Sequence, residues 1–196
     1  MIKRLFDIIF SFLGLIFLFP LLVIIALLIK IESKGPIFYL QKRVGKHNKD
    51  FKIFKFRTMF IGSDRKGLLT LGDKDPRVTK TGYILRKYKL DEFPQLINVL
   101  VGNMSFVGPR PEVRKYINHY SKEDLMILSV KPGITDYASI EFRDEAELLK
   151  ATNNPEKLYL ESILPQKIAL NKKYINSKNL FIDLNIIFKT ILTVIK

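Results

Sequence analysis

Cysteine is absent from the 196-residue chain, and histidine occurs only twice, at His47 and His119. Without thiols the chain can form neither a disulfide framework nor a thiolate metal site. Two histidines also disfavour a multi-histidine zinc site. Carboxylates remain as metal ligands, and they suit Mg²⁺.

Acidic residues are scarce relative to basic ones. The chain has 19 Asp and Glu against 33 Lys and Arg, which gives a net charge of +14. Such a surface suits nucleic acid, an anionic membrane or a phosphate-rich substrate. Internal repeats, low-complexity tracts and long linkers are also missing, and the length suffices for one compact domain.

A long apolar run covers Leu5–Ile29, interrupted by Asp7, Ser11, Gly14 and Pro20. About twenty apolar residues span a bilayer as a helix, so the run is long enough. A cleaved signal peptide fits poorly, because the run is too long and no small-residue cleavage site follows it.

Two membrane topologies are open for this run. Pro20 removes a helix hydrogen bond and favours a kink, and both flanks are basic, which tends to keep both ends in the cytoplasm. We expect a re-entrant helix that bends near Phe19-Pro20, with a single span as the alternative. Asp7 either pairs with a nearby cation or is a solvated interfacial charge. The flanking cations are Lys3, Arg4, Lys30, Lys34, Lys42 and Arg43.

The rest of the chain predicts an α+β domain that is predominantly helical. After Gly35-Pro36, strand patterns at 37–41 and 51–56 flank a polar turn and indicate a β-hairpin. The polar segment 61–81 is expected to be loop and short helix. Pro94 is expected as the first residue of a helix that Gly102 ends. Helical patterns cover 82–89, 94–100, 112–120, 122–129, 154–175 and 180–195.

The last of these helices carries an apolar stripe. Two interpretations are open: the stripe packs into the core, or the helix lies in the plane of the membrane at the cytoplasmic face. The stripe comprises Leu180, Leu184, Ile187, Phe188, Ile191 and Ile195, with polar interruptions at Asp183, Asn185 and Lys189.

Two adjacent carboxylates, Asp91 and Glu92, precede the helix that starts at Pro94, and Arg86 lies just before them. The pair could hold a divalent ion, and one member could attack phosphorus. By themselves, the same residues also fit a capping pair on an exposed turn.

Three further cations are candidates for phosphate binding. Arg110 stands between two prolines in Gly108-Pro109-Arg110-Pro111, a stiff loop that would fix its guanidinium before binding. Lys55 and Arg57 would share one face of the second strand and line the same site. The alternatives are a surface arginine on a rigid turn and basic side chains on a solvated strand.

In combination and in order, these segments resemble the bacterial sugar transferases, specifically the small monotopic phosphoglycosyl transferases of the PglC type. The resemblance covers nearly the whole chain. The matching segments are the Lys-Arg start, the apolar run with its proline, Gln41–Gly45, Lys55–Met59, Leu90–Gln95, Gly108–Pro111, Lys131–Thr135 and Asp183-Leu184.

The resemblance implies a re-entrant membrane helix over residues 1–34 and a catalytic domain over residues 35–196. That domain would lie with amphipathic interfacial helices on the cytoplasmic face of the bacterial inner membrane and depend on Mg²⁺. Asp91 would attack the β-phosphorus of a UDP-sugar, and UMP would leave. Undecaprenyl phosphate would then take the phosphosugar from Asp91, as the first membrane step of capsule, O-antigen, exopolysaccharide or glycoprotein assembly.

The resemblance also distributes roles among the site residues. Asp91 and Glu92 would hold the metal, and Glu92 would help to position it or the acceptor. The expected phosphate-binding residues are Arg86, Arg110, Lys55 and Arg57.

Two segments depart from the family pattern. Phe19-Pro20 stands where the family often has Ser-Pro, and Asp136–Arg143 replaces the commoner glycine-led stretch, so the sugar cannot be borrowed from a relative. A non-catalytic, basic membrane-surface protein is the rival hypothesis. A membrane-tethered nucleic-acid binder is weaker, because the chain has no recognised nucleic-acid module. The sequence leaves a homodimer open.

Overall fold

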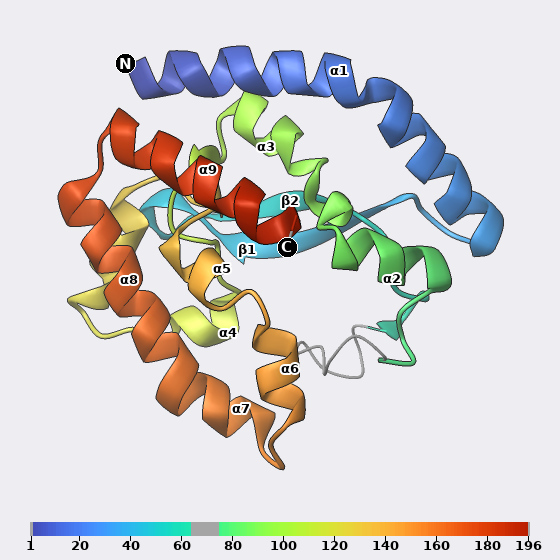
Figure 1. Ribbon diagram of the computed structural model, residues 1–196. Coiled ribbons are helices and arrows are strands. Elements are labelled where there is room, and N and C mark those ends of the chain that lie inside the picture. The colour runs from blue at the N-terminus through green and yellow to red at the C-terminus, as the bar shows by residue number, and fades with distance from the viewer. Residues whose placement is uncertain (1, 64–74, 196) are drawn as a thin grey trace.

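The computed structural model describes residues 2–63 and 75–195. It is predominantly helical α+β, as expected: a long N-terminal helix lies along a helical body that contains two small sheets (Figure 1). The expectation for 61–81 falls mostly outside the described residues.

The described elements follow in chain order. They are α1 (Ile2–Glu32), β1 (Phe38–Val44), η1 (Lys46–Asn48), β2 (Asp50–Phe56), α2 (Lys80–Lys87), η3 (Leu90–Glu92), α3 (Gln95–Val101), β3 (Ser105–Val107), α4 (Arg114–Ile117), η4 (Asp124–Ser129), β4 (Gly133–Thr135), α5 (Tyr137–Glu141), α6 (Glu145–Lys150), α7 (Pro155–Leu158), η5 (Tyr159–Ile163), α8 (Leu164–Ser177) and α9 (Leu180–Ile195). The η elements are 3₁₀ turns, except η5, which is π-helical.

Helix α1 bends near its middle, where its one proline, Pro20, lies (Figure 1). Proline cannot donate the helical hydrogen bond and clashes with the preceding turn, which accounts for a bend there. Most apolar side chains of α1 are exposed, and by length and composition the helix could cross a membrane.

Both ends of α1 are tied to the same body. At the N-terminal end, Arg4 donates to two carbonyls in the last turn of α3, at 2.6 and 2.8 Å. At the other end, Arg57 donates to the carbonyls of Ser33 and Lys34, each at 2.8 Å. Glu32 accepts from the first two N–H groups of α2. The bent helix therefore lies across the domain and does not project from it.

Asp7 is buried and not a solvated charge. Its Oδ1 accepts from the Ser105 hydroxyl at 3.0 Å and from the Phe106 N–H at 3.1 Å, at the start of β3. Lys3 bonds instead to Asp183, which also accepts from the Tyr174 hydroxyl. Asp183, a polar interruption in the sequence of α9, is therefore buried and anchors α1 to α9.

The predicted hairpin is confirmed, with longer strands. β1 and β2 pair antiparallel from Phe38 opposite Phe56 to Val44 opposite Asp50. A second sheet, β3 beside β4 in parallel, was not predicted. There the backbones of Gly108 and Gly133 meet so closely that a Cβ on Gly133 would lie 2.2 Å from the Gly108 nitrogen. Only glycine fits this crossing.

Helices α2 and α3 confirm two predictions, although α3 begins one residue after Pro94; Gly102 ends it with φ at 95°. The 154–175 prediction is confirmed as the continuous run α7–η5–α8. The 112–120 prediction is largely wrong, because α4 has four residues. At 122–129, a mutual Ser121–Asp124 cap starts a 3₁₀ turn and not an α-helix. Helices α5 and α6 were not predicted.

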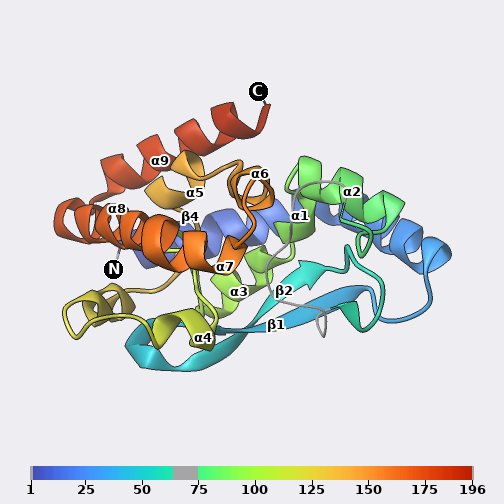
Figure 2. The ribbon, with the colours of Figure 1, turned by 90° about the horizontal axis from the view of Figure 1, so that it is seen from below.

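Helix α9 packs through a different stripe from the predicted one. Asp183 and Ile186 face the core, whereas Leu184, Phe188 and Ile191 are exposed; the side chain of Ile195 lies outside the described part. The interpretation of the predicted stripe as core-facing is therefore wrong for most of its length. Seen from below, α9 lies on the opposite side of the body from the β1–β2 hairpin (Figure 2).

Candidate active site

Asp91 and Glu92 lie in the 3₁₀ turn η3, between α2 and α3. Lys89 precedes the turn with φ at 56°, a left-handed conformation that reverses the chain after α2. Asp91 is 8% exposed and lines a cavity. Within residues 2–63 and 75–195, no group donates a hydrogen bond to its carboxylate.

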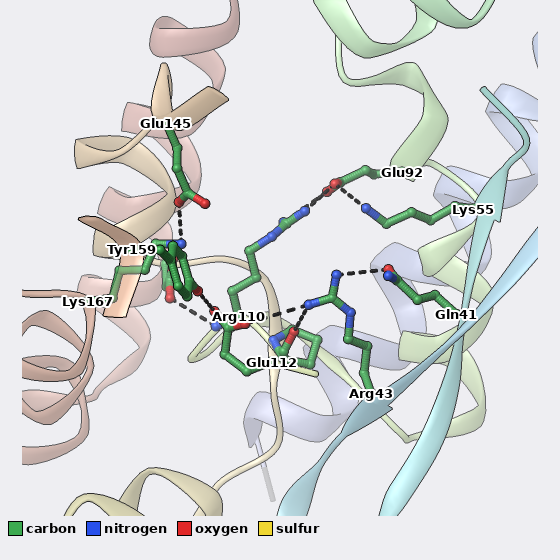
Figure 3. Close-up of polar contacts among 11 residues, drawn as sticks. Gln41, Arg43, Lys55, Glu92, Arg110, Glu112, Glu145, Tyr159 and Lys167 are labelled. Carbon is green, nitrogen blue, oxygen red and sulfur yellow. Dashed lines mark hydrogen bonds and ion pairs between the residues drawn. The ribbon is translucent and has the colours of Figure 1, made fainter. Parts of the chain in front are cut away.

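Glu92 differs sharply from its neighbour. Lys55 donates to its Oε1 at 2.9 Å, and Arg110 grips both oxygens, with Nη1 to Oε2 at 3.0 Å and Nη2 to Oε1 (Figure 3). Such two-pronged Arg–carboxylate pairs are strong and directional. One carboxylate of the pair is therefore neutralised, and the other is left open to the cavity.

The titration behaviour of the pair follows from these contacts. Burial raises the pKa of Asp91, and the charge of Glu92 adds to this, while Lys55 opposes it. Burial alone would also raise the pKa of Glu92, but Arg110 and Lys55 hold that pKa well below its usual range. Burial lowers the pKa of Lys55, and Glu92 counteracts this.

Asn98, which the sequence reasoning missed, fixes the distance between β2 and α3. Its side chain is fully buried, accepts from the Phe54 N–H at 2.9 Å and donates to the Lys52 carbonyl at 2.8 Å. Lys55 is thereby held beside the turn that carries Glu92. A polar residue in the buried stripe of a short helix is the signal that could have identified it.

The loop that carries Arg110 is held by Asp136, a second residue that was missed. The Arg110 N–H donates to Asp136 Oδ2 at 2.9 Å, and the Ser139 N–H donates to Oδ1 of the same carboxylate at 2.6 Å. The guanidinium also donates to the Ile134 carbonyl at 3.2 Å. Asp136 is completely buried, so it connects the arginine loop to the start of α5.

Lys55 and Arg110 contact the dyad directly. The other two predicted cations, Arg86 and Arg57, do not. Arg86 lines the same cavity from α2, and in the described part of the chain its guanidinium has no hydrogen-bond or ion-pair partner. The guanidinium of Arg57 instead caps the C-terminal end of α1. Arg57 lines the same cavity as Lys55, but its guanidinium is already engaged by the carbonyls at that helix end, so of the two only Lys55 contacts the dyad.

The cavity beside Asp91 has a volume of about 1180 Å³. Its walls are of three kinds. The dyad and its cations form the charged part, and residues from α1 and α9 form an apolar part. Polar residues around Arg43, Glu112 and Tyr159 form the third. The apolar wall includes Phe10, Gly14 and Leu18 of α1 and Ile191 and Val194 of α9.

Magnesium, which the family resemblance implies, can be tested against these donors. Mg²⁺ usually takes one or two carboxylates together with phosphate oxygens and waters. Both oxygens of Glu92 accept hydrogen bonds, whereas those of Asp91 accept none from residues 2–63 and 75–195. Among the described residues no group of three or more His, Asp or Glu forms a metal site. The arrangement favours a metal held by Asp91 and substrate phosphates over one held by Glu92, whose oxygens already bind two cations.

Comparison with known proteins identifies the family. A model of the bacterial sugar transferases matches residues 1–196. A UDP-N-acetylgalactosamine-undecaprenyl-phosphate N-acetylgalactosaminephosphotransferase of Aeromonas hydrophila is 38% identical, over 99% of this chain and 44% of that protein. A UDP-glucose:undecaprenyl-phosphate glucose-1-phosphate transferase of Escherichia coli (strain K12) is 36% identical, over 97% of this chain and 39% of that protein.

The chain thus spans less than half the length of these two relatives. It covers 83% of the exopolysaccharide production protein ExoY of Sinorhizobium fredii, to which it is 36% identical over 96% of its own length. The motif order, the charged cavity and these matches agree. This chain belongs to the bacterial sugar transferase family.

Proposed function

We propose that the chain transfers a sugar-1-phosphate from a UDP-sugar to undecaprenyl phosphate, through a covalent intermediate on Asp91 and with release of UMP. The relatives from Aeromonas hydrophila and Escherichia coli are named for such donors and for this acceptor. The observation that carries the proposal is the asymmetry of the dyad. Asp91 is buried, accepts no hydrogen bond from any described residue and is open to the cavity, while Arg110 and Lys55 neutralise its neighbour.

In the first step, a carboxylate oxygen of Asp91 attacks the β-phosphorus of the donor. The bond from that phosphorus to the bridging oxygen breaks, and UMP leaves with the bridging oxygen. Burial supports this role, since a poorly solvated carboxylate with a raised pKa is a stronger nucleophile than one in water. Arg110 and Lys55 would exchange part of their contact with Glu92 for the diphosphate, and Arg86 would meet the charge on the leaving UMP.

In the second step, a phosphate oxygen of the lipid attacks the phosphorus of the aspartyl-phosphosugar. The bond from phosphorus to Asp91 breaks, which frees the carboxylate and produces the diphosphate-linked lipid. The apolar wall from α1 and α9 suits the prenyl chain of such an acceptor. When Mg²⁺ is bound by Asp91 and the phosphates, it supplies charge neutralisation of the diphosphate.

Membrane placement follows from the same elements. The exposed apolar surface of α1, its bend at Pro20 and the attachment of both its ends to one body support a re-entrant helix. The exposed stripe of α9 supports an in-plane helix at the same interface. We place the body on the cytoplasmic face of the bacterial inner membrane, where the sugar donor is available.

The substitution Asp91→Asn tests the chemistry. Full-length protein in detergent is given UDP-sugars, undecaprenyl phosphate and Mg²⁺, and UMP release is measured. We expect turnover by the wild type and by Asp144→Asn, an exposed aspartate outside the cavity, and none by Asp91→Asn. Full turnover by Asp91→Asn would exclude Asp91 as the nucleophile. Failure of the wild type on every donor would favour the non-catalytic alternative.

The membrane topology has a separate test. Because the chain has no cysteine of its own, an introduced cysteine is the only thiol that can be labelled. The single-cysteine variants Ile2→Cys and His47→Cys are labelled in intact cells with an impermeant thiol reagent and again after permeabilisation. We expect both to react only after permeabilisation. Labelling of Ile2→Cys in intact cells would establish a single span.

A further inference from the structure

The polar part of the cavity contains side-chain atoms that are buried without a partner. Among the described residues, Arg43 Nε, Ser139 Oγ and Asn171 Oδ1 make no hydrogen bond, and all three residues line the cavity. Asn171 is only 5% exposed. Buried polar atoms are normally bonded, and leaving them unpaired is costly. Such a group on a cavity wall indicates a place for a polar ligand.

These residues lie next to the proposed phosphate site. Asp136 accepts from the N–H of Arg110 and from that of Ser139, which connects Ser139 to the arginine loop. Asn171 lies one turn along α8 from Lys167, whose ammonium sits 5.0 Å from the ring centre of Tyr159. Figure 3 shows Tyr159 and Lys167 across Arg110 from Lys55. A group attached to a phosphate bound at Arg110 would therefore reach this region.

Hydrogen bonds fix the polar wall of the cavity near Tyr159. This residue opens η5, a π-helical turn inside the rod formed by α7 and α8. Such turns insert an extra residue and often occur at functional sites. The Tyr159 hydroxyl donates to Glu112 at 2.7 Å, and Arg43 lies 3.8 Å from the other oxygen of Glu112. The ligand would meet polar groups that are already oriented.

The chemistry of the wall favours a sugar over a nucleobase. Bases are usually bound by stacking on a free aromatic face. The ring of Tyr159 has Lys167 above it and the Tyr116 ring at 4.6 Å. A free N–H, a free hydroxyl and a free amide oxygen match sugar hydroxyl and acetamido groups, which both donate and accept.

We infer that Ser139 and Asn171 bind the sugar ring of the donor and select among hexoses. The inference rests on the proposed function, because it assumes that a sugar-1-phosphate occupies the site. Ser139 belongs to α5, within the 136–143 segment that departs from the family pattern. Because this segment differs from the common family pattern, a sugar preference particular to this chain would be expected to depend on it.

The test compares Ser139→Ala and Asn171→Leu with the wild type. The matched control is Asn176→Leu, an exposed asparagine on the same helix that does not line the cavity. Full-length proteins are assayed for UMP release with UDP-glucose, UDP-galactose, UDP-N-acetylglucosamine and UDP-N-acetylgalactosamine. Inhibition by UMP and the Tm of each protein are also measured. Leucine keeps the branching of asparagine at Cγ but is larger and apolar, so the Tm is needed to separate a loss of sugar binding from a change in packing.

We expect the two cavity variants to lower kcat/KM for the preferred donor by roughly 10-fold to 100-fold and to change the ranking of donors. Inhibition by UMP should stay within about twofold of the wild type, and the Tm of Asn171→Leu should be unchanged or higher. An unchanged ranking with wild-type kcat/KM would overturn the inference alone. Equal losses for all donors together with weaker UMP inhibition would assign the region to the nucleoside and also overturn it. No turnover by the wild type would overturn the proposed function itself.

Discussion

The substitution Glu92→Gln should destabilise the protein, and inorganic phosphate should restore part of the loss. Glu92 neutralises two partly buried cations, Lys55 and Arg110, through three hydrogen bonds. Without its charge, both cations lose the carboxylate that they contact together. A phosphate in the cavity supplies the missing negative charge, which is the role proposed for the donor diphosphate.

The magnitude follows from the partial burial of these groups. Removing one partner of a fully buried ion pair costs about 3–5 kcal/mol, because the other charge stays buried and unpaired. The side chain of Arg110 is 35% exposed, so solvent screening lowers this cost, and glutamine keeps one carbonyl oxygen, which retains about 1 kcal/mol of hydrogen bonding. We therefore expect a loss of about 1–3 kcal/mol, and each kcal/mol lowers the Tm by about 2–4 °C for a chain of this size.

The pH dependence has a definite sign. The pKa of Glu92 is lower in the folded protein than in the unfolded chain, so its contribution is present at neutral pH. The contribution is lost as pH falls from about 4.3 through the lower folded-state pKa. The Glu92→Gln variant should lack this part of the acid sensitivity.

The assay is thermal unfolding of the full-length protein in detergent, with and without phosphate at constant ionic strength. Glu156→Gln is the matched control, because Glu156 pairs with Lys115 on the surface, where both side chains are about half exposed. The control should lose less than about 1 kcal/mol and show no added response to phosphate. The reasoning is refuted if Glu92→Gln is as stable as the wild type, or if phosphate raises the Tm of all three proteins equally.

Four other outcomes follow from the geometry. Asp91→Asn should raise the Tm at pH 7, because a raised folded-state pKa means that the ionised carboxylate opposes folding there. The acidic limb of kcat/KM should accordingly lie above the ordinary aspartate pKa of about 3.9, as a pH–rate profile would show. Asn98→Ala leaves an N–H and a carbonyl of β2 unpaired and should cost about 2–4 kcal/mol in urea denaturation. Gly133→Ala forces a Cβ into the Gly108 backbone and should prevent accumulation of folded protein, measured by size-exclusion chromatography.

The elements that could be predicted are those with local signals. Alternating residues produced the β1–β2 hairpin, and Pro94 and Gly102 marked the limits of α3 to within a residue. The β3–β4 sheet has no comparable signal, because each strand is three residues long and its partner lies 28 positions away. Its formation depends on the contact between two glycine backbones, which no periodicity reports.

The candidate site was predictable where side-chain direction follows a regular rule. Lys55 lies within β2, where side chains alternate between the two faces, and it points toward Glu92 as predicted for a residue that lines the site. Arg57 follows the last residue of β2, so the alternation no longer governs its direction, and its guanidinium turns to the end of α1. Asn98 and Asp136 act by bonding backbone groups distant in sequence, and residue type alone does not reveal such partners.

Sequence spacing could not choose between the two adjacent carboxylates, and the three-dimensional contacts supply the missing criterion. A nucleophile needs an unshared oxygen lone pair and access to the substrate, whereas an anchor for cations needs the opposite. Glu92 has both oxygens engaged, and Asp91 has neither engaged by a described residue while it lines the cavity. The arrangement favours Asp91 as the attacking group and gives Glu92 the task of holding Arg110 and Lys55 in place until phosphate arrives. If so, Glu92→Gln should change mainly the KM for the donor and keep the chemical step, whereas Asp91→Asn should abolish the chemical step.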